Sequence, residues 1–147
     1  MRLCQVSEMI DAIVAADEDL VARAEILTSI PGIAKVTACA IMTEMPELGQ
    51  ITGKQAAKLA GLAPISRQSG RWQGKERIQG GRASVRRAIY LPAVVATRFN
   101  PDMKRKYEQL ISVGKCKKLA ITAVMRKLIV MANALLRDQR KWTQNTA

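Results

Sequence analysis

The sequence predicts a mainly α-helical protein, a single helical domain with a helix-hairpin-helix-like motif and a loop rich in glycine and arginine. Three observations predict it. The 147 residues match one ordinary domain, and 48% of them are hydrophobic, enough for one core. Apolar residues recur at helical spacing through most of the chain. Only five residues are aromatic, so aliphatic side chains must form the core.

The first predicted element is a helix over residues 1–26. Its apolar residues alternate at intervals of three and four, the spacing of a coiled-coil seam. They are Leu3, Val6, Ile10, Ile13, Leu20, Ala24 and Leu27. Asp17 interrupts this seam where an apolar residue belongs. The segment is therefore either an amphipathic helix packed on its own domain or the end of a coiled-coil linker.

Turn and capping signals divide residues 27–140, the predicted main domain, into further helices. Pro31-Gly32 forms a turn, Thr52 and Gln55 form a capping box, and Pro101 takes a favoured first helical position. The helix after the Pro31-Gly32 turn is expected to end near Met45. Further helices are expected at Gly53 to about Ala60, Ala83–Phe99, Asn100 to about Val113, and about Lys117–Arg140. Pro92 is expected to kink or split its helix. One short β-hairpin fits near residues 70–79, and residues 141–147 are expected to fray.

Several classes of chemistry are excluded by composition. The chain has no histidine, which excludes Ser-His-Asp and Cys-His catalysis and histidine metal sites within it. Cys4, Cys39 and Cys116 are widely spaced, so a zinc finger or a disulfide framework is not expected. We expect no cofactor in this chain and a cytoplasmic location. The apolar stretch Leu119–Leu136 carries two central cations, which argues against a membrane span.

The charge is distributed very unevenly. The net charge is +12, from 24 basic and 12 acidic side chains. Residues 1–50 hold three basic and eight acidic side chains, whereas residues 51–147 hold 21 basic and four acidic ones. A soluble fold does not need such an excess, and a polyanionic partner explains it.

The turn between the first two helices is the first candidate nucleic-acid contact. Pro31, Gly32 and Ile33 resemble the hairpin of helix-hairpin-helix motifs, whose backbone amides bind a DNA phosphate without reading sequence. Lys35 would add a positive charge. The alternative is a plain connection between two helices.

The second candidate is the basic loop at residues 61–82 with the helix that follows. Glycines, Trp72 and serines interleave its cations, and arginine suits bidentate phosphate contacts. The cations are Arg67, Arg71, Lys75, Arg77, Arg82, Arg86 and Arg87. A solvated charged face is the alternative. Ser66, Ser69 and Ser84 are equally eligible hydroxyls that arginines could assist in attacking a phosphodiester.

Residues from about Leu27 to Arg137 resemble the C-terminal domain of insertion-sequence transposases of the IS110 type, a family that includes pilin-gene invertases and bridge-RNA-guided recombinases. The order and spacing of short motifs carry the resemblance. They are Ile30-Pro31-Gly32-Ile33, Ala60-Gly61-Leu62-Ala63-Pro64, Gln68-Ser69-Gly70, Gly74, Ile78, Gly81, Arg86-Arg87-Ala88-Ile89-Tyr90, Asn100-Pro101, Gly114-Lys115 and Ala123-Val124-Met125-Arg126-Lys127-Leu128.

The resemblance implies a DNA recombinase. Full-length members carry an N-terminal RuvC-like domain with an acidic metal site, and a serine taken as the nucleophile matches Ser69. Arg67, Arg71 and Arg86 are candidates, by proximity, to hold the attacked phosphate. The implied partners are duplex DNA, a structured guide RNA in some members, and further copies of the full-length enzyme at the bacterial nucleoid.

This chain lacks the N-terminal domain of the pattern, so we expect the fragment alone to be inactive. Two other hypotheses stay open. One is a non-catalytic helix-hairpin-helix nucleic-acid-binding module. The other is an interaction protein that dimerises through the seam of its first helix and binds an acidic protein.

Overall fold

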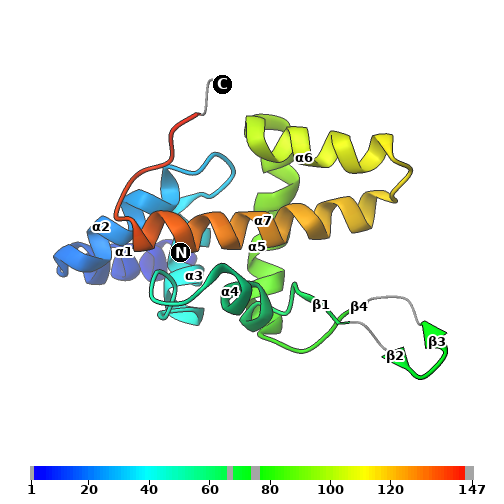
Figure 1. The fold of residues 1–147 in the computed structure, drawn as a ribbon. Coiled ribbons are helices and arrows are strands. Elements are labelled where there is room, and N and C mark those ends of the chain that lie inside the picture. Colours follow the sequence, from blue (N-terminus) through cyan, green and yellow to red (C-terminus); the bar gives the residue numbers. More distant parts are fainter. Residues whose placement is uncertain (1, 66–67, 74–76, 145–147) are drawn as a thin grey trace.

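The computed structural model describes residues 2–65, 68–73 and 77–144. Its described part is mainly α-helical, which confirms the predicted fold class. The helices are α1 (Arg2–Ala15), α2 (Glu18–Thr28), α3 (Lys35–Glu44), α4 (Gly53–Leu59), α5 (Ala83–Phe99), α6 (Pro101–Ser112) and α7 (Lys117–Arg137). Four two-residue strands are β1 (Pro64–Ile65), β2 (Gln68–Ser69), β3 (Trp72–Gln73) and β4 (Arg77–Ile78). Figure 1 shows α5 crossing α7 steeply, with the strands projecting from the helices.

The core is built around α7. This helix packs against α2, α4, α5 and α6, and it buries Val124, Leu128, Ile129 and Ala132. Apolar residues that recur at helical spacing in this part of the sequence are therefore buried in the core. With a mean hydropathy of 1.7, α7 is apolar and long enough to cross a membrane. Its central place among four helices accounts for that composition.

Side-chain caps fix the starts of three helices, α2, α4 and α6. The capping box of Thr52 and Gln55 opens α4, as predicted. Asn100 is buried, and its Oδ1 accepts a hydrogen bond from the Asp102 amide at 3.1 Å, which opens α6. Its Nδ2 donates to the Pro31 carbonyl at 3.2 Å. Asn100 thus joins the start of α6 to the α2–α3 turn.

The prediction of a single helix over residues 1–26 is wrong in one respect, because α1 ends at Ala15 and α2 begins at Glu18. Asp17 begins a second helix, and its carboxylate accepts hydrogen bonds from the amides of Asp19 and Leu20 at 2.9 and 3.3 Å. A carboxylate at this position satisfies free amides and favours a helix start over continuation. None of the described residues of α1 is buried. No part of the structure tests the coiled-coil interpretation.

The expected split at Pro92 does not occur, since α5 runs unbroken from Ala83 to Phe99. Pro92 is buried on the side that faces the α2–α3 turn. Gly32 has φ of +106°, and a Cβ placed on it would lie 2.9 Å from both the Pro92 carbonyl oxygen and the Ala96 Cβ. The α2–α3 turn therefore packs directly on α5 at the Pro92 carbonyl and Ala96, where only glycine allows so close an approach.

The C-terminal segment also differs from the expectation of a frayed tail over 141–147. The Trp142 amide donates to Ser29 Oγ at 2.8 Å, and the indole packs against the core. Lys141 Nζ lies 3.3 Å from a Glu25 carboxylate oxygen. A large apolar side chain next to α2 explains why this segment docks. Residues 145–147 lie outside the described part of the chain.

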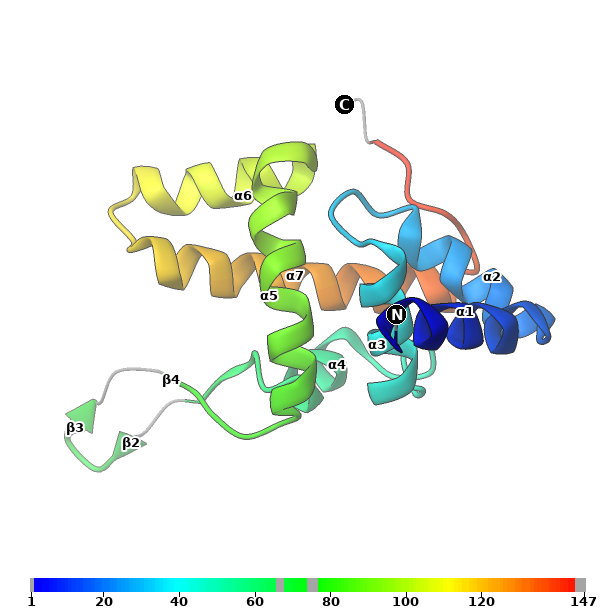
Figure 2. The same cartoon turned by 180° about the vertical axis from the view of Figure 1, so that it is seen from behind.

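The strands form a projecting ribbon, which we call the arm (residues 62–80). β1 pairs antiparallel with β4, and β2 pairs antiparallel with β3. The turn at its tip passes through Gly70 and Arg71. Figure 2 shows the arm extending away from the helices. A short hairpin is present near the predicted residues 70–79, but its turn lies earlier, at Gly70 with φ of +61°, between β2 and β3.

Two glycines bring the ends of the arm together at its root. Gly61 and Gly81 have φ of +68° and +66°. A Cβ on Gly61 would collide with the Gly80 carbonyl, and a Cβ on Gly81 would collide with the Gly61 backbone. The Arg82 amide donates to the Leu59 carbonyl at 2.8 Å beside this crossing. Only glycine allows the two backbones to approach so closely.

Two arginines lock the root to the helices. Arg82 Nη2 lies 2.6 Å from Glu47 Oε1, and its Nη1 donates to the Glu44 carbonyl at 2.5 Å. Arg86 donates to the Gly80 carbonyl. The hydrogen bond from Arg82 lowers the pKa of Glu47, and a backbone hydrogen bond lowers it further. The same contact with Glu47 raises the pKa of Arg82.

We predict that Gly81→Ala lowers the free energy of unfolding by about 2 kcal/mol or more, because strain and a backbone collision add. Gly70→Ala is the matched control. Gly70 has φ of +61°, but a Cβ added there would meet no other atom within 4 Å, so strain alone should cost about 1 kcal/mol. Urea unfolding measures both. Equal losses in the two variants would contradict the close approach at the root.

We also predict that the stabilisation from Glu47 depends on pH. Its pKa in the folded protein lies below its ordinary value of 4.5. The contribution is therefore fully present above pH 4.5 and is lost as pH falls through the folded value. Urea unfolding of wild type and Glu47→Gln should differ near pH 7 and converge in acid. Exposed Glu8→Gln is the control. A difference that does not change with pH would count against the pairing with Arg82.

Candidate nucleic-acid interface

The tip of the arm holds the serine predicted from the sequence. Ser69 pairs through its backbone with Trp72, and Gly70 and Arg71 connect the two strands. Arg71 is exposed. Arg67, Lys75 and Ser66 lie outside the described residues, as do the side chains of Ser69 and Arg77. The arm therefore presents the Ser69 backbone and an exposed arginine two residues later, away from the core.

The remaining predicted arginines divide into two groups. Arg82 and Arg86 lie at the root, where both donate hydrogen bonds to the protein itself. Arg87 is exposed on α5. The predicted basic patch is therefore divided into three parts. Arg71 lies at the tip, Arg82 and Arg86 form hydrogen bonds within the protein at the root, and Arg87 is exposed on α5. Ser84 Oγ, another candidate hydroxyl, donates to a Glu44 carboxylate oxygen at 2.7 Å.

The helix-hairpin-helix-like turn lies elsewhere. Ile33 is buried, and Gly32 and the Pro31 carbonyl face α5 and Asn100. Lys35 Nζ lies 2.8 Å from Asp11 Oδ1. The turn packs on the C-terminal half of α5, whereas the arm joins its N-terminal end. The structure therefore does not bring the two predicted sites together.

A second basic surface was missed by the sequence reasoning. Between Met103 and Arg137 the chain has nine basic side chains and one acidic, Glu108. Lys115, Lys117 and Lys118 are exposed where α6 turns into α7. No carboxylate of the described residues forms an ion pair with these three. The three lysines that follow Gly114 were the sequence signal that could have identified this surface.

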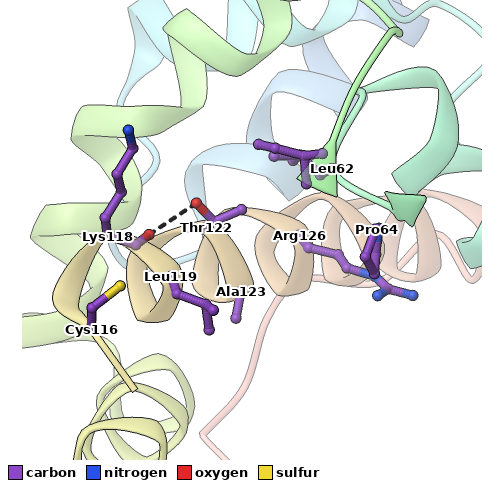
Figure 3. Close-up of a pocket in the computed structure, with 9 residues that line it drawn as sticks. Leu62, Pro64, Cys116, Lys118, Leu119, Thr122, Ala123 and Arg126 are labelled. Atoms are coloured by element: carbon purple, nitrogen blue, oxygen red, sulfur yellow. Dashed lines mark hydrogen bonds between the residues drawn. The ribbon is translucent and has the colours of Figure 1, made fainter. Parts of the chain in front are cut away.

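A cleft lies between the arm root and α7, with a volume of about 530 Å³. Figure 3 shows α7 along one side of it, with Leu119, Ala123 and Arg126 on that helix. Leu62, Pro64 and Ile78 line the side nearer the arm. The lining is mostly apolar and contains no acidic side chain among the described residues. The cleft thus connects the arm to the basic end of α7.

The described residues offer no group of three acidic or cysteine side chains that could hold a metal ion. The chemistry available to them is cationic binding of an anion, supplied by Arg71, Arg87 and the α6–α7 lysines.

The sequence is similar to those of a transposase family, a pilin gene-inverting protein and insertion-element proteins. The family profile described as "Transposase IS116/IS110/IS902 family" matches residues 24–108. The chain is 32% identical over 143 residues to a pilin gene-inverting protein of Moraxella bovis, covering 94% of this chain and 44% of that protein. It is 31% identical over 119 residues to an insertion element IS900 42 kDa protein of Mycobacterium paratuberculosis, covering 79% and 30%.

An insertion element IS110 43.6 kDa protein of Streptomyces coelicolor is 30% identical over 115 residues, covering 77% of this chain and 28% of that protein. The chain spans less than half the length of these relatives. The family profile itself covers more than half of the chain and includes the arm. The protein therefore belongs to the IS116/IS110/IS902 family of transposases.

Proposed function

We propose that this chain is the DNA-binding and strand-exchange domain of an IS110-type recombinase that acts in DNA transposition. The observation that carries the proposal is the arm, which presents the Gln68-Ser69-Gly70-Arg71 turn away from the helical core. Membership of a transposase family and a pilin gene-inverting relative support the reaction class. Ser69 is the proposed nucleophile, assigned by resemblance and supported by its place at the tip.

The proposed chemistry conserves bond energy and needs no added oxidant or nucleotide. Ser69 Oγ loses its proton and forms a bond to phosphorus, while the phosphorus–oxygen bond of the strand breaks and the leaving oxygen gains a proton. A hydroxyl of a second strand then loses its proton and bonds to the same phosphorus, while the bond from phosphorus to Ser69 Oγ breaks and the serine oxygen regains a proton. Arg71 is the best-placed described cation to stabilise the developing charge, because Arg86 is engaged at the root.

For the full-length enzyme the proposal includes the partners that the resemblance implies. They are an N-terminal RuvC-like domain with its divalent metal, further copies of the enzyme, and a structured guide RNA. They also include a place in the bacterial cytoplasm, at the nucleoid. This chain alone is then expected to bind DNA without completing strand exchange.

A non-catalytic nucleic-acid-binding module is the second candidate. The exposed lysines at the α6–α7 turn favour it, because they lie on the helical core and not at the tip that carries Ser69. Binding there would not depend on a nucleophile. The first candidate function therefore requires Ser69 as a nucleophile and the second does not. Both require the cations to bind phosphates.

We predict that Ser69→Ala abolishes recombination by a full-length enzyme that contains this domain, while its affinity for duplex DNA changes less than about twofold. Removing one hydroxyl deletes the nucleophile but leaves every phosphate-binding cation in place. Gel assays of recombination products and fluorescence anisotropy measure the two effects. Ser84→Ala is the control and should still recombine. Recombination by Ser69→Ala would refute the catalytic assignment.

We further predict salt-sensitive binding of duplex DNA to this chain. About six phosphate contacts give a slope of about −5 in a plot of log affinity against log salt. Replacing Lys117 and Lys118 with Gln should reduce the slope by about two, because each lysine releases one counterion equivalent. Lys141→Gln is the control, since Lys141 already pairs with Glu25. A slope near zero for the wild type would contradict both candidate functions.

A further inference from the structure

The cleft between the arm root and α7 is apolar although it opens to solvent. Leu119 remains 47% exposed and Ile78 39% exposed beside it. Its volume of about 530 Å³ falls in the range of small-ligand sites, about 300–1,000 Å³. An open apolar cleft at the foot of a projecting arm indicates a ligand with an apolar body.

The cations around the cleft indicate that this ligand is negatively charged. Lys118 and Arg126 line it, and Lys115 and Lys117 are exposed at the same end of α7. The 21 residues of α7 include no acidic side chain. Lys117 and Arg126 are separated by about 14 Å along the helix axis, so these cations are spread along α7 and do not meet at one point. The ligand therefore combines an apolar body with a series of negative charges.

An unpaired nucleotide has both properties. In a duplex the apolar base faces are stacked against neighbouring bases, so only paired edges and the backbone are presented. An unpaired base exposes its faces, and a guanidinium plane can stack on them. Arg126 extends toward Pro64 at the arm root in Figure 3.

We propose that this cleft binds an unpaired nucleotide of the nucleic acid that the arm holds, with Arg126 against the base and the α7 lysines on the flanking phosphates. The inference rests on the proposed function. Strand exchange separates base pairs near the attacked phosphate, and the cleft lies where the arm leaves the core.

The lining also predicts little discrimination between bases. Thr122 is the hydroxyl of the cleft, and its Oγ1 already donates to the Lys118 carbonyl at 2.9 Å. The donors left are the charged groups of Lys118 and Arg126 and the weakly donating thiol of Cys116, and the other lining side chains are apolar. Stacking and apolar contact accept every base, because each has a π-face.

The test uses three labelled DNAs with the same sequence of about 20 base pairs, a length that spans about two helical turns. One is a perfect duplex, one carries a bulge of three thymidines, and one carries the same bulge with abasic nucleotides. Anisotropy at fixed salt should show that the wild-type chain binds the base-bearing bulge at least about fivefold more tightly than the abasic bulge. The abasic DNA separates recognition of the base from the flexibility of the backbone.

Two variants connect that preference to the cleft. Arg126→Lys keeps the positive charge but removes the planar guanidinium group that would stack on the base. Ala123→Leu fills the cleft with a larger side chain. Both should reduce the preference for the base-bearing bulge to less than about twofold while affinity for the perfect duplex stays within about twofold of wild type. Ala22→Leu, on the exposed side of α2, adds the same volume and should leave the preference unchanged. Arg126→Lys keeps the test valid if Ala123→Leu does not fold.

The other outcomes overturn the inference in distinguishable ways. Wild-type binding to the duplex without any preference between the two bulges would refute the nucleotide site and leave the proposed function standing. A full preference in both variants would place base recognition elsewhere. A change in sedimentation of Ala123→Leu with its preference intact would make the cleft a protein contact. A wild-type chain that binds none of the three DNAs would refute the proposed function itself.

Discussion

The close approach of Gly61 and Gly81 is the constraint on which the rest of the structure depends. Because neither residue has a side chain, the two ends of the arm can cross in contact. Arg82 and Arg86 then tie this crossing to the α3–α4 connection and to the arm itself. The arm can project from the helical core only because its root is fixed in this way.

This root also separates two kinds of arginine that look alike in the sequence. Arg82 and Arg86 satisfy carbonyls and a carboxylate of the protein, so they position the arm. Arg71 and Arg87 are exposed and remain available to a phosphate. The positive surface of the domain is completed by the lysines at the α6–α7 turn. Under the proposed function, nucleic acid would contact an arm held at its root on one side and the basic end of α7 on the other.

Local signals predicted most of the helices because their causes are local. The capping box at Thr52, the start at Asn100-Pro101 and the apolar face of α7 all follow from nearest neighbours along the chain. The break at Asp17 was visible as a polar residue in an apolar seam, but its role as an N-cap depends on backbone geometry. The continuity of α5 through Pro92 was not predicted, because α5 packs against α3 and α7, which lie far from it in the sequence.

The candidate site was predicted less completely for the same reason. The family resemblance assigned the role of nucleophile to Ser69, which stays a prediction, whereas the ion pair of Arg82 with Glu47 could be found only from the fold. The lysines at Gly114 were readable as a charged run, yet nothing in the sequence placed Lys118 in one cleft with Pro64 and Ile78 of the arm root. Long-range contacts thus determine which basic side chains form hydrogen bonds or ion pairs within the protein.

The most direct measurement is the mass of the protein after reaction with a cleavable DNA substrate. A full-length enzyme containing this domain would be mixed with a DNA whose cleaved strand diffuses away, digested, and analysed by mass spectrometry. The account predicts a nucleotide adduct on the peptide that contains Gln68-Ser69-Gly70, at the serine oxygen. An adduct on another residue, or efficient strand exchange with no protein–DNA intermediate, would contradict it.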